Sequence, residues 1–291
     1  ILNNVIDTVP PQRQLDKHYT CKSALFTTAD FDHDGKSEIF HVESGKTGNV
    51  YKGYYLFNTP STFVDYHEFD VTLPSTPKHI FSGDFNNDGM TDIVLFCETG
   101  YKVFLNQGMA HGTCPFSDSS AYTGTDISSK LRMVQGDFNG DGLADFIMNN
   151  KESADYYLLF CNGDGSFTKS AAFQLGIADQ ETDRDDGKMT ILALNLDHDN
   201  KTDLMVGKAI YEYHGGITPY TEYKRTEFRW FHSTGTGFEL VRKTRTDDPE
   251  DARPRYLFTG DFTGNGQTEL MNYGSDIWST TMSLTMNLNG E

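Results

Sequence analysis

Short runs of apolar and β-branched residues alternate along the chain with clusters of turn-forming residues, and such runs predict strands. One group reads "KHIFSG", "DIVLFCE", "YKVFLNQ" and "PFSDSS", and the next reads "LRMVQG", "DFIMNN", "ADYYLLFC" and "SFTKSAAFQL". No helical periodicity lies between the runs. The pattern therefore predicts an all-β protein made of groups of four short antiparallel strands.

A polar loop separates the first and second strand of each group, and it occurs five times. Its copies span residues 30–38, 84–92, 137–145, 195–203 and 261–269, so successive copies begin 54, 53, 58 and 66 residues apart. Four strands at a period of this length are typical of a β-propeller blade. We expect residues 1–291 to form a single β-propeller domain. It is either five-bladed, with "NNVIDTVP" supplying the closing strand, or part of a larger propeller.

The spacing inside the loop predicts a calcium site. Oxygen-bearing side chains stand at positions one, three, five and nine, and position seven offers a main-chain carbonyl. Calcium takes six to eight oxygen ligands, and such a loop supplies most of them. A glycine at position six permits the sharp bend. Position twelve of the second copy is the apolar Leu95, where an EF-hand has glutamate, so the loop joins strands. An acidic turn without an ion is the alternative.

The first three copies offer the more complete ligand sets. They are Asp30, Asp32, Asp34, Lys36 and Glu38; Asp84, Asn86, Asp88, Met90 and Asp92; and Asp137, Asn139, Asp141, Leu143 and Asp145. The other two are Asn195, Asp197, Asp199, Lys201 and Asp203; and Asp261, Thr263, Asn265, Gln267 and Glu269. In the fourth copy Asn200 replaces glycine, and we expect the bend to survive because Asn tolerates a left-handed backbone. The fifth copy has two carboxylates. We expect Ca²⁺ at three strong sites and weak or no binding at the other two.

The phrases "GDFNNDGMTDIV", "GDFNGDGLADFIM" and "NGDGSF" resemble the FG-GAP or VCBS repeats of bacterial and integrin-type β-propellers. The resemblance covers almost the whole chain, from about residue 22 to residue 290. It implies a propeller with calcium in the loop between the first and second strand of each blade. The phrases "FRWFHSTGTGFEL" and "GDFTGNGQTELMNYGSD" also look like propeller segments of bacterial RHS-repeat and Tc-toxin-like proteins.

The formal net charge of -18 is partly ligand charge, because the five loops hold 15 of the 42 Asp and Glu residues. The remaining acidity argues against nucleic acid and anionic membranes as partners. No stretch approaches 18 consecutive apolar residues, so we expect no membrane insertion. Cytosolic calcium is too scarce for such sites, which favours an extracellular, secreted or cell-surface location. The chain begins at Ile1 without a signal-peptide pattern, which indicates that any signal peptide is already absent.

Two long connections, at residues 176–188 and 207–228, are expected on the face opposite the calcium loops. Long loops on a rigid scaffold often carry binding residues. The second connection contains the partner-binding candidates Tyr211, Tyr213, His214, Tyr220 and Tyr223. Interleaved tyrosines suit contact with protein or sugar. The same segment alternates well enough to form an extra hairpin, and the sequence leaves both interpretations open.

The chain has no HExxH, GxSxG, Walker or dinucleotide-binding motif, so the sequence does not favour an enzyme, although it leaves that question open. The leading interpretation is a calcium-stabilised β-propeller that acts as a protein-interaction or scaffold module. It would belong to a secreted or surface bacterial protein, such as an RHS or Tc-like toxin with flanking domains. The alternative is a carbohydrate-binding lectin or a carbohydrate-active glycosidase or lyase.

Overall fold

The computed structural model describes residues 25–57, 65–116, 121–124, 131–150, 155–176, 189–197, 199–215, 220–246, 256–260, 269–275 and 280–285. Over these ranges the regular elements are strands, joined by loops and turns. No helix in these ranges has the length and apolar character needed to cross a membrane. The prediction of an all-β chain is confirmed for this part of the protein.

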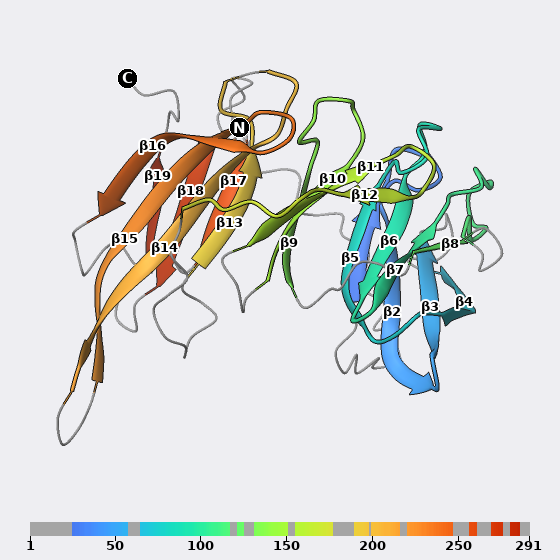
Figure 1. Cartoon of the computed structure of the whole chain (residues 1–291). Coiled ribbons are helices and arrows are strands. Elements are labelled where there is room, and N and C mark those ends of the chain that lie inside the picture. Colours follow the sequence, from blue (N-terminus) through green and yellow to red (C-terminus); the bar gives the residue numbers. More distant parts are fainter. Residues whose placement is uncertain are drawn as a thin grey trace, which may run out of the picture.

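Five antiparallel sheets follow one another along the chain, each built from strands that are consecutive in sequence (Figure 1). The first holds β1 (Leu25–Ala29), β2 (Glu38–Thr47), β3 (Val50–Phe57) and β4 (Asp65–Thr72), and the second holds β5 (Pro77–Gly83), β6 (Asp92–Cys97), β7 (Gly100–Phe104) and β8 (Ala121–Gly124). The third holds β9 (Leu131–Gly136), β10 (Asp145–Asn150), β11 (Tyr156–Cys161) and β12 (Phe167–Lys169), and the fourth holds β13 (Met189–Leu194), β14 (Asp203–His214), β15 (Tyr220–Ser233) and β16 (Phe238–Thr246). The fifth has three described strands, β17 (Tyr256–Gly260), β18 (Glu269–Ser275) and β19 (Thr280–Thr285). The predicted four-stranded unit is confirmed in the first four sheets.

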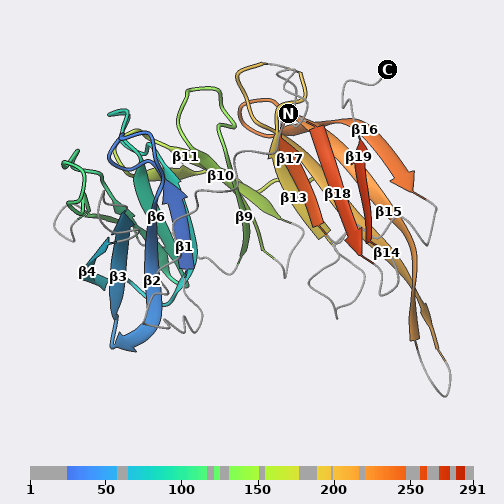
Figure 2. The ribbon, with the colours of Figure 1, turned by 180° about the vertical axis from the view of Figure 1, so that it is seen from behind.

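Neighbouring sheets meet through their first strands. Strand β1 contacts β5, β9 contacts β13, and β13 contacts β17. Between the second and third sheets, Gln135 on β9 donates a hydrogen bond to the carbonyl of Ser82 on β5 (2.9 Å). In Figures 1 and 2 the first two sheets lie at one end, the last two at the other, and the third between them. The described strands do not show a closed ring, and "NNVIDTVP" lies outside the described residues. Successive antiparallel sheets that touch through their first strands form a β-propeller-like array.

The core lies between consecutive sheets and is built by middle strands that are buried on both faces. Every residue of β6 is buried. Ile93 and Leu95 pack into the cluster shared with the first sheet, whereas Val94 and Phe96 pack into the cluster shared with the third. Successive side chains of a strand point to opposite faces. A continuous apolar run in the sequence is therefore what a middle strand between two neighbouring sheets requires.

The predicted fourth strand of the second group, "PFSDSS", is wrong, because the fourth strand of the second sheet is β8. Phe116 belongs to a loop and is buried between the first two sheets. Its ring contacts Phe31 and Phe40, with centroids 5.2 and 5.6 Å apart. Residues 117–120 of the run lie outside the described residues. An apolar residue that fills the gap between two sheets cannot be told from a strand residue by its hydrophobicity.

The third and fourth sheets approach closely at Gly136, the last residue of β9. A Cβ atom at this position would lie 2.6 Å from Cγ2 of Thr202. Thr202 is itself fixed, because its hydroxyl accepts the N–H of Asp137 (2.9 Å) and its own N–H donates to the carbonyl of Asp137 (2.6 Å). The two sheets can therefore meet in this way only if position 136 has no side chain.

We expect Gly136→Ala to lower the free energy of unfolding by about 1–3 kcal/mol, because the added methyl group overpacks the contact with Thr202. Chemical denaturation would measure the change. Gly237→Ala is the matched control, since its Cβ would lie 3.8 Å from the nearest atom, Oγ1 of Thr234. Its expected effect is within about 0.5 kcal/mol. Equal effects of the two substitutions would contradict the close approach.

Candidate metal loops

The first four polar loops connect the first and second strands of their sheets, as predicted. The second loop, for example, runs from the end of β5 to the start of β6. Of the fifth loop, residues 261–268 and the side chain of Glu269 lie outside the described residues. The fifth ligand set, Asp261, Thr263, Asn265, Gln267 and Glu269, therefore stays a prediction.

Each of the first three loops folds around its position-one carboxylate. In each loop the N–H of the position-six glycine donates to that carboxylate. The pairs are Gly35 with Asp30 (2.9 Å), Gly89 with Asp84 (2.8 Å) and Gly142 with Asp137 (2.8 Å). These glycines have φ values of 85°, 80° and 88°, so the predicted bend is confirmed. Position four is also left-handed, with φ values of 60°, 61° and 80° at His33, Asn87 and Gly140. The sequence signal for this second bend was the His, Asn or Gly at that position.

Positions three and five face one another inside the loop. In the second loop the side-chain amide of Asn86 donates to Oδ2 of Asp88 (2.9 Å), and in the third the amide of Asn139 donates to Asp141 (2.8 Å). The position-five carboxylate also accepts the N–H of position seven, for example Met90 to Asp88 (2.8 Å). The side-chain oxygens of positions one, three and five are thereby collected within one short turn.

The position-nine carboxylate is the buried member of each set. Glu38, Asp92, Asp145 and Asp203 are 1%, 0%, 0% and 1% exposed. One oxygen of each accepts the N–H of position two, donated by Phe31 (2.8 Å), Phe85 (2.9 Å), Phe138 (3.1 Å) and Leu196 (2.7 Å). The other oxygen of the last three accepts a backbone N–H from the last residue of the third strand or from two residues beyond it. The donors are Asn106, just after β7 (2.7 Å), Cys161 (2.8 Å) and Ser233 (2.8 Å). Position nine therefore clamps its loop to its own sheet.

The same three residues also reach the preceding sheet. The side chain of Asn106 donates to the carbonyl of Phe31 (2.7 Å), Cys161 Sγ to that of Phe85 (3.4 Å), and Ser233 Oγ to that of Phe138 (2.6 Å). We call each such position a joint residue. Sequence reasoning missed them, because the residue types differ and they follow position nine by 14, 16 and 30 residues.

Burial changes the acidity of the position-nine carboxylates. It raises the pKa of Asp92 and of Asp145 to about 6 each, because desolvation disfavours the charged form. The backbone N–H donors oppose this shift, and the nearby loop carboxylates add to it. Burial also raises the pKa of Glu38 and of Asp203. A divalent cation in the loop would favour the ionised form.

The first loop has the clearest fit to a cation. Oδ1 of Asp30 and Oε1 of Glu38 are buried and have no hydrogen-bond partner among the described residues. Asp30, Asp32 and Glu38 each offer a ligand atom, and these atoms lie within 4.8 Å of one another. Buried polar atoms are normally paired, so these two oxygens indicate a missing partner. In the second and third loops the carboxylate oxygens at positions one and five accept loop N–H groups. A carboxylate oxygen that accepts one hydrogen bond still has a lone pair that could bind a cation.

The fourth loop departs from the other three. Its position-one side-chain amide, on Asn195, donates to the carbonyl of Asp199 (2.7 Å). The ammonium group of Lys201 pairs with the Asp199 carboxylate, as Lys36 pairs with Asp34 in the first loop (3.1 Å). The left-handed bend expected at Asn200 is wrong, because His33 and Asn87 are the non-glycine residues with positive φ in the described ranges. A lysine already neutralises one of the predicted ligands of this loop.

The segment at 207–228 is a hairpin, so the extra-hairpin interpretation is confirmed. It extends β14 and β15 away from the fourth loop, pairs Tyr211 with Tyr223 and ends with His214 opposite Tyr220 (Figure 1). The rings of His214 and Tyr220 stack with centroids 4.6 Å apart, and Tyr220 is 58% exposed. The side chains of Tyr211, Tyr213 and Tyr223, and the connection at 177–188, lie outside the described residues.

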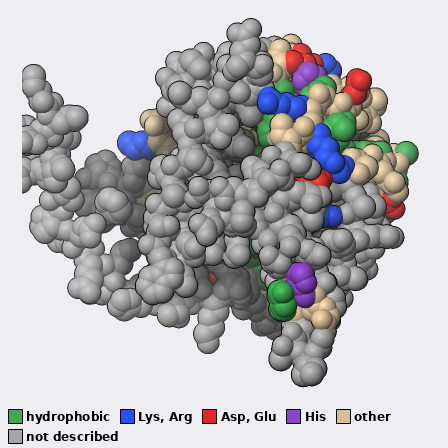
Figure 3. Space-filling view, turned by 90° about the vertical axis from the view of Figure 1, so that its left-hand side faces the viewer, with side chains coloured by type: hydrophobic (Ala, Val, Ile, Leu, Met, Phe, Trp, Pro, Cys, Tyr) green, Lys and Arg blue, Asp and Glu red, His purple; other side chains and the backbone are tan. Residues whose placement is uncertain are grey.

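Strand β16 forms the outer edge of the fourth sheet. Leu240 and Val241 are 49% and 47% exposed, and Arg242 and Lys243 beside them are also exposed. In Figure 3, which looks onto this end of the molecule, Lys and Arg side chains lie next to hydrophobic ones on the described part of the surface. An exposed strand edge with apolar side chains is a suitable docking surface for another chain.

Comparison with known families found one match. The FG-GAP-like repeat model matches residues 30–95, 84–148 and 137–206, which together span more than half of the chain. Each match begins at position one of a loop and includes the loop that follows it. A search of curated proteins found no significant match.

We expect Asp145→Ala to lower the free energy of unfolding by about 2–6 kcal/mol, since it leaves two buried N–H donors without an acceptor at about 1–3 kcal/mol each. The experiment is chemical denaturation in excess chelator, so that loss of a metal ligand does not contribute. The control is Asp70→Ala, whose side chain is 64% exposed and pairs with Lys52 at the surface. Its expected effect is below about 1 kcal/mol. Similar losses in the two variants would contradict the clamp.

Proposed function

Because the chain belongs to the FG-GAP-like repeat family, we propose that it is a calcium-stabilised, β-propeller-like interaction module that works outside the cell. The repeats and their antiparallel sheets support an interaction module. Calcium is proposed from the loops, and a protein partner from the exposed surfaces. The two parts can fail separately, so each has its own test.

The observation that carries the calcium proposal is the pair of buried, unpaired oxygens on Asp30 and Glu38. In the first three loops the ligands would be the side chains at positions one, three, five and nine and the carbonyl at position seven. The second and third loops repeat the same inward arrangement around Asp84 and Asp137. The fourth and fifth loops would bind weakly or stay empty. The ion would have a structural role, because it relieves the repulsion among carboxylates held in one turn.

The expected contribution of calcium to the free energy of unfolding depends on the ratio of the calcium concentration to the dissociation constant of each site. A site with a dissociation constant near 0.1 mM in millimolar calcium contributes roughly 1.4 kcal/mol. Three independent sites would contribute on the order of 4 kcal/mol, a large share of the stability of a typical domain. Millimolar calcium is an extracellular condition, which is why we propose a secreted or cell-surface location.

We expect the melting temperature to be lower in excess chelator than in millimolar calcium, because the loops then lose their counter-charge. Asp88→Ala and Asp141→Ala each remove one carboxylate from a predicted ligand set and should reduce the calcium-induced shift. Asp70→Ala, outside the loops, should keep the full shift. Differential scanning calorimetry would measure all four proteins. Identical melts of the unsubstituted protein in both buffers would leave the loops as acidic turns and remove the support for the location.

The partner proposal rests on two surfaces of the fourth sheet. The hairpin presents the His214 and Tyr220 rings in an exposed stack, and the edge of β16 presents Leu240 and Val241 beside cationic residues. Aromatic and Arg side chains are enriched in protein interfaces, and a free strand edge can pair with another strand. A protein partner accounts for both surfaces, and an RHS or Tc-like assembly would be one source of it. A sugar would use the aromatic stack alone.

We expect the triple variant Tyr211→Ser, Tyr213→Ser and Tyr220→Ser to keep a melting temperature close to that of the unsubstituted protein while losing partner binding. Parallel affinity capture with quantitative mass spectrometry would identify proteins that only the unsubstituted chain retains. A collapse of the melting temperature would show that these tyrosines belong to the core. A glycan array probed with both proteins tests the alternative, and selective sugar binding that the triple variant loses would replace the protein proposal with a lectin.

A further inference from the structure

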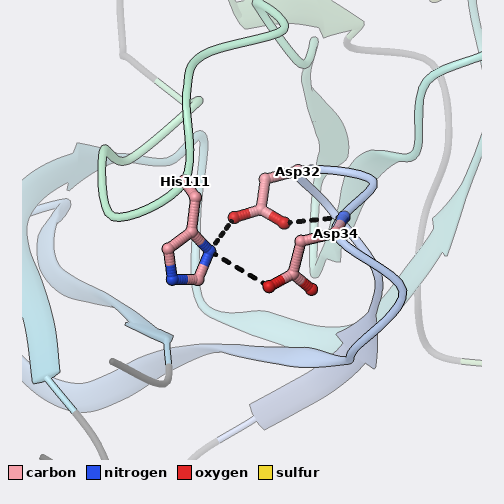
Figure 4. A group of neighbouring side chains, drawn as sticks. All are labelled: Asp32, Asp34 and His111. Atoms are coloured by element: carbon pink, nitrogen blue, oxygen red, sulfur yellow. Dashed lines mark hydrogen bonds and ion pairs between the residues drawn. The ribbon is translucent and has the colours of Figure 1, made fainter. Parts of the chain in front are cut away.

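A histidine from the second sheet reaches into the first metal loop. His111 lies in the loop between β7 and β8, and its imidazole points at the carboxylates of Asp32 and Asp34 (Figure 4). Its Nδ1 atom is 2.6 Å from Oδ2 of Asp32 and 3.4 Å from Oδ2 of Asp34. The three residues offer ligand atoms within 4.8 Å of one another. His111 and Asp32 are 79 residues apart in the chain.

The loop that carries His111 is held in place by the first sheet. His67 on β4 shares a hydrogen bond with the carbonyl of Gly112 through Nε2 (2.7 Å). The edge of the Phe57 ring meets the imidazole, with centroids 5.9 Å apart and an interplanar angle of 84°. These contacts position the imidazole beside the loop before any cation binds.

An independent observation points to a ligand at the same place. Glu38 is 1% exposed, and its Oε1 atom has no hydrogen-bond partner among the described residues. It shares a second candidate ligand group with Asp30 and Asp32, and the Asp32 side chain is 0% exposed. Asp32 thus belongs both to the carboxylate group and to the group that contains His111. The unpaired Glu38 oxygen therefore lies in a carboxylate group that adjoins His111 through Asp32.

The ligand chemistry differs from that of the second loop. In the equivalent place over the second loop, the turn between β11 and β12 offers Gly165, whose N–H donates to the carbonyl of Phe85 (2.8 Å). Calcium takes oxygen ligands, whereas imidazole nitrogen suits zinc and other transition metals. A set of carboxylates with one imidazole is a donor set that zinc accepts. The imidazole nitrogen of the first loop therefore favours a different cation from the one that the second loop would bind.

A similar group lies at the fourth loop, where Asp197, Asp203 and His232 offer ligand atoms within 4.8 Å. There both oxygens of Asp203 accept backbone N–H groups. A lysine pairs with the position-five carboxylate in both loops, Lys36 with Asp34 and Lys201 with Asp199. That group has no unpaired buried oxygen among the described residues, which distinguishes it from the group at the first loop.

We propose that the first loop is a mixed oxygen and nitrogen site that binds a transition divalent cation such as Zn²⁺ in preference to calcium. Asp32, Asp34 and His111 are its ligands, and the adjoining group of Asp30 and Glu38, which shares Asp32, adds negative charge beside it. The bound cation links the first sheet to the second through His111. The inference rests on the proposed function in that the first loop is a cation site. It limits calcium in that loop to conditions without a transition cation and leaves the second and third loops as calcium sites.

The test is zinc titration of the full chain in millimolar calcium, followed by isothermal calorimetry. The unsubstituted protein should bind one zinc ion that calcium does not displace. His111→Ala and His111→Gln should bind it at least about 10–100-fold more weakly, since even outer partners of a metal site cost that much when lost. The Gln side chain keeps a hydrogen-bond donor toward the carboxylates, so it guards against loss of folding. His79→Ala removes a histidine from β5 and should bind zinc normally.

X-ray absorption at the zinc edge gives a second readout, with an imidazole nitrogen at about 2.0–2.1 Å in the unsubstituted protein and none in the His111 variants. Zinc binding that both His111 variants retain, complete displacement by calcium, or a spectrum without imidazole would each overturn the proposal. The calcium-induced shift in melting temperature should persist in the His111 variants. If the unsubstituted protein shows no calcium-induced shift but binds zinc through His111, the calcium proposal is refuted and this inference stands.

Discussion

The buried carboxylate at position nine is the interaction on which the rest of the structure depends. Burying a charged group is costly unless its oxygens are paired. Asp92, Asp145 and Asp203 meet this condition with two backbone N–H donors each, one from the loop and one from the third strand. The loop, the second strand and the third strand therefore have to assemble together. This requirement explains why an acidic residue stands at the start of an apolar strand in repeat after repeat.

The joint residues extend the same network from one sheet to the next. Asn106, Cys161 and Ser233 each donate through the backbone to position nine of their own sheet and through the side chain to the loop of the preceding sheet. A cation bound in a loop would thus stabilise the contact between two sheets as well as a turn. The carbonyl that receives the side chain belongs to position two, next to the first predicted ligand. The position-nine carboxylates and the position-two carbonyls therefore belong both to the predicted metal loops and to the contacts that join the sheets.

The contacts between sheets are not equivalent, and their differences carry the functional inferences. The first loop is covered by His111 and retains two unpaired buried oxygens, whereas the fourth has an amide in place of the position-one carboxylate, on Asn195. The fourth sheet also extends β14 and β15 into a hairpin and leaves β16 as an exposed edge. The proposed interaction surfaces therefore lie on the fourth sheet, whereas the loop with unpaired oxygens belongs to the first.

The sequence by itself determined the local units of this protein. Alternation and apolar runs predicted β5, β6, β9 and β10, and the loop spacing predicted the turns between them, because these features depend on neighbours a few residues away. Tertiary structure alone decided the joint residues, the burial of Phe116 in a loop and the approach of His111 to Asp32. These contacts join groups 75, 76, 95 and 79 residues apart for Asn106, Cys161, Ser233 and His111. The packing of the sheets determines these partners. A local residue pattern does not specify which side chain of the neighbouring sheet will lie next to it.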